Sequence, residues 1–174
     1  ASIGGKDSMS GSFEGLDVPP TLVSFATAIG NTRDVQSPEF KKANSAVVML
    51  RPQYKDGLPE IGSLIAIYKT VEQMIEEGKV LSAATPGYGG VAEALFKMCV
   101  GNHVGLQLSN DLNFNDLFKP AYGSVILELL DPSAGEFLGF TTVDYTLEAG
   151  KEMIDLAKLQ EKWEAKLEPV FPYR

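Results

Sequence analysis

Apolar residues recur along this chain with two different spacings, and these spacings predict its strands and helices. Residues 21–28 combine β-branched and aromatic side chains without a charge, which is typical of a strand buried on both faces. The turn-forming segment 131–135 separates two further apolar runs, 124–130 and 137–143, which we expect to pair as a hairpin. Other strands are predicted at 46–50, 80–83 and 104–108.

Three segments have the helical period instead. From Ile61 to Ile75 apolar residues recur every three or four positions, and Gly78 is the expected C-terminal stop. A second helix follows the glycine turn at 85–90, and the last one runs from the candidate N-cap Asp155 to residue 167. This order of strands and helices predicts an α+β fold in which helices cover a mixed sheet.

The polar segment 31–43 is predicted to connect two domains. Residues 13–18 also look like a polar connection, and the prolines at 19 and 20 stop any helix before the strand at 21–28. The predicted boundary separates 1–36, the remnant of one domain, from a second domain at 37–174. Because the chain begins without methionine inside the approach to a glycine-rich segment, we expect it to be a piece of a longer protein.

The glycine-rich segment 4–12 carries the chain's densest candidate chemistry. Its glycines let backbone N–H groups converge on an anion, Lys6 supplies a mobile positive charge, and Asp7 is a hard oxygen ligand suited to Mg²⁺. Ser8 and Ser10 add hydroxyl groups. The spacing differs from a Walker A motif, so we interpret the segment as another kind of nucleotide loop; an ordinary surface turn would have the same composition.

Several short sequence motifs along the chain resemble those of a known protein family. They are Gly-Lys-Asp-Ser-Met-Ser at 5–10, Pro-Pro-Thr-Leu-Val-Ser-Phe-Ala at 19–26, Pro-Glu-Phe-Lys at 38–41, the double glycine at 89–90, and Leu-Glu-Pro-Val-Phe-Pro at 167–172. In this order and spacing the sequence resembles phosphoribosylformylglycinamidine synthase, the large amidotransferase of purine biosynthesis. The resemblance covers essentially the whole chain.

The resemblance implies a fold and an activity. Residues 37–174 would form a three-layer α/β/α domain like the C-terminal domain of aminoimidazole ribonucleotide (AIR) synthase, and 1–36 would belong to the N-terminal-like domain. The parent would be an ATP-dependent carbon–nitrogen ligase that converts formylglycinamide ribonucleotide (FGAR), ATP and glutamine to the amidine product FGAM, ADP, phosphate and glutamate. Its remaining parts, the first synthetase half and a glutaminase domain, would be partners of this chain.

The resemblance also implies roles for individual residues. Asp7 would be a Mg²⁺ ligand, and Lys6, Ser8 and Ser10 would lie near the phosphates of bound ATP or ADP. In the resembled superfamily a His-Asp pair often precedes the glycines of the turn at 85–90, and the corresponding residues here are Ala84 and Thr85. Without a titratable side chain this turn supplies no general base or metal ligand.

The missing pair fits the second, non-catalytic copy of the synthetase unit, which holds a structural nucleotide. No catalytic residue is therefore assigned, and the isolated chain is expected to be inactive. The glycine turn at 85–90 could bind an anion or could serve close packing of helix against strand, and both interpretations stay open.

Two other functions fit the same sequence features. One is another member of the same ATP-binding superfamily, such as AIR synthetase, selenophosphate synthetase or thiamine-monophosphate kinase. The other is a non-catalytic module whose nucleotide is a permanent scaffold, or which binds none and only supports packing between domains.

Composition restricts the partners further. A net charge of −8 and a pI near 4.7 argue against binding to nucleic acid or to an anionic membrane surface. The single cysteine, Cys99, is expected to be buried in a reduced, cytoplasmic protein, and His103 to be structural. If the apolar strand at 21–28 is exposed, the chain is expected to self-associate through it.

Overall fold

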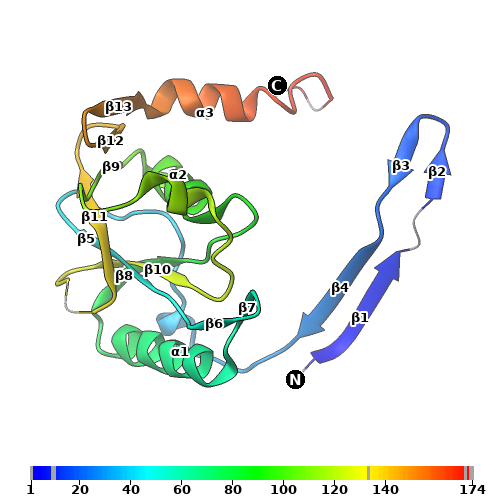
Figure 1. The fold of residues 1–174 in the computed structure, drawn as a ribbon, viewed down its shortest axis with the longest axis horizontal. Helices are drawn as coiled ribbons and strands as arrows, with labels where there is room; N and C mark the ends of the chain where they lie inside the picture. The colour runs from blue at the N-terminus through cyan, green and yellow to red at the C-terminus, as the bar shows by residue number, and fades with distance from the viewer. Residues whose placement is uncertain (1, 9–10, 133, 171, 173–174) are drawn as a thin grey trace. The chain divides into compact units, whose positions relative to one another are not determined.

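The computed structural model describes residues 2–8, 11–132, 134–170 and 172, which form two compact units (Figure 1). Unit 1 comprises Ala1–Val35 and unit 2 comprises Gln36–Arg174. Their assignment to AIR-synthase N-terminal-like and C-terminal-like domains stays a prediction.

Unit 1 is built from two antiparallel strand pairs. Strand β1 (Ser2–Ser8) pairs with β4 (Thr21–Ala26), and β2 (Gly11–Phe13) pairs with β3 (Leu16–Val18). A turn at Glu14, where φ is 52°, joins β2 to β3. The polar connection expected at 13–18 is thus wrong, because this turn lets the short flanking segments pair as a hairpin.

The strand expected at 21–28 is confirmed over β4, but its predicted burial on both faces is wrong. All six residues of β4 are exposed. The reason is that the sheet holding β4 has only two strands among the described residues, and nothing in unit 1 covers either face. The uncharged pattern identified the strand correctly but could not show that its covering layers are not in this unit.

Unit 2 contains a seven-stranded mixed sheet in its described part, with the order β13-β12-β9-β11-β5-β10-β8. Only the β12–β9 pair is parallel. The strands are β5 (Ala46–Leu50), β8 (Val80–Ala84), β9 (Gly105–Leu108), β10 (Val125–Leu129), β11 (Glu136–Thr142), β12 (Thr146–Ala149) and β13 (Glu152–Asp155). A separate two-stranded ribbon pairs β6 (Tyr54–Lys55) with β7 (Leu58–Pro59).

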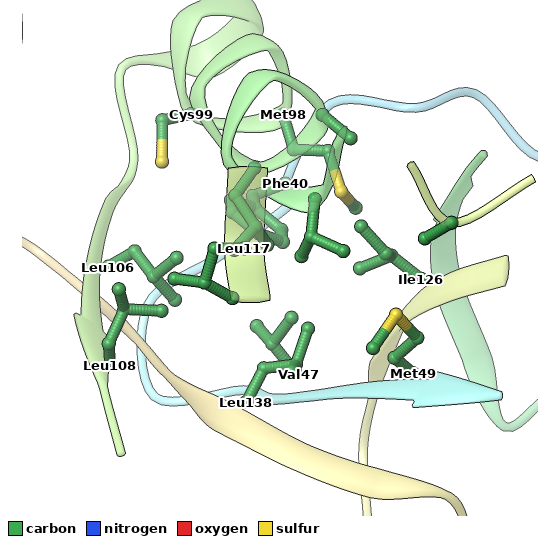
Figure 2. Close-up of a cluster of buried hydrophobic side chains, with 14 of the residues drawn as sticks. Phe40, Val47, Met49, Met98, Cys99, Leu106, Leu108, Leu117, Ile126 and Leu138 are labelled. Carbon is green, nitrogen blue, oxygen red and sulfur yellow. The ribbon is translucent and has the colours of Figure 1, made fainter. Parts of the chain in front are cut away.

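Helices cover both faces of this sheet, which confirms the predicted α+β fold and its three layers. Helix α1 (Ile61–Glu76) lies on one face and α2 (Gly90–Asn102) on the other (Figure 1). Successive residues of a strand point to opposite faces. Accordingly Val47 and Met49 of β5 belong to the apolar cluster under α2 (Figure 2), whereas Val48 between them packs in the α1 layer.

The helix ends follow their local sequence signals. Gly78 has φ of 68°, and its N–H donates to the carbonyl of Ile75 while the N–H of Lys79 donates to Met74. This pair of bonds is a Schellman motif, so the predicted stop of α1 is confirmed. The predicted N-cap Asp155 is also confirmed, since its carboxylate accepts from the Lys158 N–H at the start of α3 (Leu156–Glu164).

The expected hairpin between 124–130 and 137–143 is wrong, because β5 lies between β10 and β11 and pairs with both. Strands are about 4.8 Å apart, so a connection of several residues can step over one strand. Placing β5 in the interior buries Ala46, Val47, Val48 and Met49 on both faces. The β12–β13 hairpin was not predicted, because its two strands are short and partly polar and so lack a clear alternation of apolar residues.

Candidate functional site

The first candidate site is the predicted nucleotide loop at 4–12, and its described residues lie in strands β1 and β2 and not in a loop. Lys6 and Asp7 lie in β1 opposite Val23 and Leu22 of β4, and both are exposed. As neighbours on an extended strand their side chains project from opposite faces of the ribbon. The Lys6 Nζ lies 3.5 Å from the Asp7 carbonyl oxygen. Within unit 1 the two charges therefore do not converge on one phosphate.

One glycine of this segment, Gly5, is required by packing. A Cβ at Gly5 would lie 2.8 Å from the carbonyl oxygen of Val23, so only glycine fits this close approach of the two strands. The register puts Gly5 opposite Ser24. Because β1 requires a glycine at position 5, part of this strand has a composition typical of loops. The sequence pattern therefore suggested a loop.

The two serines of the prediction are only partly placed. Ser8 ends β1, where its backbone pairs with Thr21, and Ser10 lies outside the described residues. No group of three or more potential His, Cys, Asp or Glu ligands occurs among the residues that the structure describes. Asp7 thus fits Mg²⁺ only as a single ligand, a number that suffices when nucleotide phosphates and water complete the octahedron.

The second candidate is the glycine turn before α2, and its geometry favours close packing over anion binding. Gly90 has φ of 71°, and a Cβ there would lie 2.6 Å from the Leu117 carbonyl oxygen and 2.7 Å from that of Lys119. The Gly89 N–H already donates to Glu93 Oε2 at 2.8 Å. The N-terminus of α2 is therefore occupied by the Glu93 carboxylate of the same helix and by the backbone of residues 117–119.

Electrostatics at this turn agree with that geometry. The side chain of Lys97 lies 2.6 Å from Glu93, and together with the Gly89 N–H it lowers the pKa of the Glu93 carboxyl. A fixed negative charge therefore sits where an anion would have to bind. Ala84, the last residue of β8, and Thr85 bring no titratable group to the turn.

The lone cysteine and the lone histidine both take part in packing. Cys99 lies on the buried side of α2, and burial raises the pKa of its thiol to about 12, so it is not a thiolate nucleophile at neutral pH. His103 caps α2 with φ of 54°, and its ring packs against Tyr145 with centroids 4.9 Å apart. The burial of Cys99 confirms that part of its prediction, whereas the structural role of His103 stays a prediction.

A hollow of about 840 Å³, lined by apolar and charged residues, has no local sequence signal because its residues come from distant segments. Its two cations are paired with carboxylates. Arg51 lies 3.6 Å from Glu136, and Lys119 lies 2.6 Å from Asp116. These pairs leave little positive charge to attract an anion, so the hollow is a weaker candidate for phosphate binding than its arginine and lysine suggest.

The fold of this chain is that of phosphoribosylformylglycinamidine synthase. The PurL protein of Thermotoga maritima in complex with ADP superposes with a TM-score of 0.61 over 80% of this chain, at 12% identity. The same protein in complex with FGAR superposes with a TM-score of 0.59, also over 80% of the chain and at 11% identity. At such identities the likeness establishes the fold.

A sequence relationship adds to the structural one. The chain is 33% identical to the PurL subunit of phosphoribosylformylglycinamidine synthase from Methanocaldococcus jannaschii over an alignment of 88 residues. This alignment covers 47% of the chain. These comparisons confirm the resemblance predicted from the sequence. The chain spans 12% of the length of that subunit and 28–30% of the two T. maritima structures. No protein-family model matches the sequence.

Proposed function

We propose that this chain is part of an ATP-dependent phosphoribosylformylglycinamidine synthase of purine biosynthesis. The supporting observation is the 33% identity to a PurL subunit, in a chain that also has the PurL fold. The parent would use FGAR, ATP and glutamine, and would work in the cytoplasm. The relatives reported above are all PurL proteins, which favours this ligase over other members of its superfamily.

Within the parent, unit 1 would contribute to an auxiliary Mg²⁺–nucleotide site. T. maritima PurL has been solved with ADP and with ATP, so proteins of this fold accept these nucleotides. Asp7 would bind the metal, and Lys6, Ser8 and Ser10 would lie near the phosphates. When bound, Mg²⁺ would offset the phosphate charge. Because Lys6 and Asp7 point to opposite faces of β1, other parts of the parent must complete this site.

The second candidate function is a scaffold without chemistry, and the α2 turn supports it. Glu93 occupies the N–H of Gly89, and Ala84 and Thr85 supply no acid, base or metal ligand. Unit 2 would then stabilise the parent by packing. The two functions are compatible, because a nucleotide that binds only the folded state stabilises that state without being turned over.

The test uses a chimera in which this chain replaces the matching part of the M. jannaschii PurL subunit. Nucleotide that copurifies with the chimera would be measured by mass spectrometry, and ADP release would be followed with FGAR, ATP and glutamine. Asp7→Asn should lower bound nucleotide about tenfold, whereas Asp17→Asn, an exposed acid elsewhere in unit 1, should not. Equal nucleotide content in both variants would contradict the magnesium role of Asp7.

A second measurement separates the ligase proposal from the site assignment. The chain by itself should release no ADP in the presence of FGAR, ATP and glutamine, because the proposed catalytic half lies elsewhere in the parent. Turnover by the isolated chain would overturn the auxiliary role, and a folded chimera without activity would argue against the ligase itself.

A further inference from the structure

A groove beside the last helix lies apart from the residues of the proposed magnesium site. It lies in unit 2 beside the C-terminal end of α2 and along α3, has a volume of about 1340 Å³, and continues along residues 165–168. Figure 1 shows where α2 and α3 lie in this unit. We call this groove the α3 groove. Its floor is formed by His103 and Tyr145, and its apolar wall by Trp163 and Leu167.

Ring contacts and hydrogen bonds fix this floor and wall. The Trp163 indole meets the Phe96 ring edge to face with centroids 5.8 Å apart, and His103 meets Tyr145 at 4.9 Å. The Tyr145 hydroxyl donates to Gln160 Oε1 at 2.8 Å. The groove is therefore preformed, which lowers the entropic cost of binding.

The rim of the α3 groove is acidic. Glu161, Glu164 and Glu168 lie on it together with a single lysine, Lys166. Gln160 continues the hydrogen-bond chain from the floor by donating to Glu164 Oε1 at 2.7 Å, which orients that carboxylate. The residues that face a ligand thus combine an aromatic strip with excess negative charge.

The aromatic strip, the acidic rim and the size of the α3 groove indicate which kind of partner it would bind. The volume exceeds the 300–1000 Å³ usual for pockets that enclose small molecules, and the groove is open along one side, as grooves that receive a helix are. Leu167 and Trp163 remain 63% and 45% exposed, so apolar area is still available for a partner. Carboxylates beside aromatic faces favour Lys and Arg side chains, through ion pairs and cation–π contacts.

We propose that the α3 groove binds a basic amphipathic helix of a partner protein, with apolar residues against Trp163 and Leu167 and cationic residues toward Glu161 and Glu164. The site lies on unit 2 and involves neither the residues nor the nucleotide of the proposed magnesium site. It can therefore fail or succeed independently of the function proposed above.

The sole tryptophan of the chain lies in this groove, so its fluorescence reports binding directly. The probe is a synthetic peptide of leucine and lysine, about four helical turns long, with its apolar residues on one face. Titration into the full chain should shift Trp163 emission to shorter wavelength and saturate. The same peptide with glutamate in place of lysine should give no shift.

Two double variants separate the groove from general charge attraction. Glu161→Lys with Glu164→Lys should weaken peptide binding about tenfold or more, because two attractive contacts become repulsive. Glu72→Lys with Glu76→Lys makes the same change of charge on the exposed surface of α1 and should change binding less than twofold. Circular dichroism and urea unfolding would verify that both variants fold.

Three results would overturn the proposal. One is equal weakening by the two double variants, which would indicate attraction to the net charge alone. Another is an equal response to the glutamate peptide, which would indicate an apolar site of no charge preference. The third is Trp163 emission that shifts to shorter wavelength as the concentration of the chain alone is raised, which would show that a second copy already covers the groove.

Discussion

The buried carboxylate of Glu128 accepts a hydrogen bond of 2.8 Å from the backbone N–H of Lys41, 87 residues earlier in the chain. Glu128 lies in β10 and is fully buried. Its carboxylate also accepts from the Lys42 N–H at 3.3 Å and from the Ser82 hydroxyl at 3.0 Å. One acidic side chain thus ties the segment entering unit 2 to the interior strand β10 and to the edge strand β8.

Removing this carboxylate should destabilise unit 2. Glu128→Ala leaves the buried Ser82 hydroxyl and two partly buried backbone N–H groups without their acceptor, and we expect it to lower the free energy of unfolding by about 3 kcal/mol. Glu128→Gln keeps one acceptor oxygen and should cost about 1–2 kcal/mol. Urea unfolding followed by Trp163 fluorescence measures both. The matched control, Glu72→Ala on the exposed face of α1, should stay within about 0.5 kcal/mol of the starting protein.

Gly78 and Gly90 both have a left-handed backbone conformation. Comparing their alanine variants distinguishes the cost of backbone strain from the cost of a steric clash. Gly90→Ala places a Cβ 2.6 Å from the Leu117 carbonyl oxygen, whereas a Cβ at Gly78 has no atom within 4 Å. Both have positive φ, 71° and 68°. We expect Gly78→Ala to cost about 1 kcal/mol and Gly90→Ala about 3 kcal/mol in urea unfolding. Equal costs would show that the α2 turn is not closely packed.

Local signals made much of unit 2 predictable. The apolar period from Ile61 and the stop at Gly78 fixed α1, and Asp155 marked the start of α3, because caps and helical faces depend on residues a few positions apart. Strand partners were less accessible. The apolar runs at 124–130 and 137–143 were correctly predicted as strands. The insertion of β5 between them depends on burial by residues distant in the sequence, which a local turn pattern does not contain.

The candidate site was harder to predict than the fold. Glycine and serine around Lys6 suggested a loop, since the pattern does not record that Gly5 must approach Val23 within a strand pair. The α3 groove combines residues 103, 145 and 160–168, which only the folded chain brings together. Its one visible signal was the amphipathic final helix, and that pattern is equally typical of a helix packed on a core.

Acid should weaken unit 2 partly through Glu39. Hydrogen bonds from Lys41 and Ser37 lower the pKa of this carboxyl from 4.5 to about 2. Because the folded-state pKa is the lower one, the stabilisation is present above pH 4.5 and is lost as pH falls toward 2. Glu39→Gln should reduce the pH dependence of unfolding in that window, by a modest amount since both side chains are about 30% exposed. Urea titrations at several pH values measure it, with Glu72→Gln as the control that should leave the slope unchanged.

The exposed ribbon of unit 1 should make the chain self-associate. Leu22 is 85% exposed and Phe25 is 54% exposed, and among the described residues β4 has a strand partner, β1, on one edge only. Such an apolar edge strand is a template for pairing with a second copy. Leu22→Lys should weaken association about tenfold in sedimentation velocity, because a lysine must then be desolvated at the contact. Glu14→Gln, which changes the charge of the same unit equally at the β2–β3 turn, should not. If the unmodified chain sediments only as a monomer at high concentration, β4 is not an association edge and its apolar side chains must be explained by other parts of the parent protein.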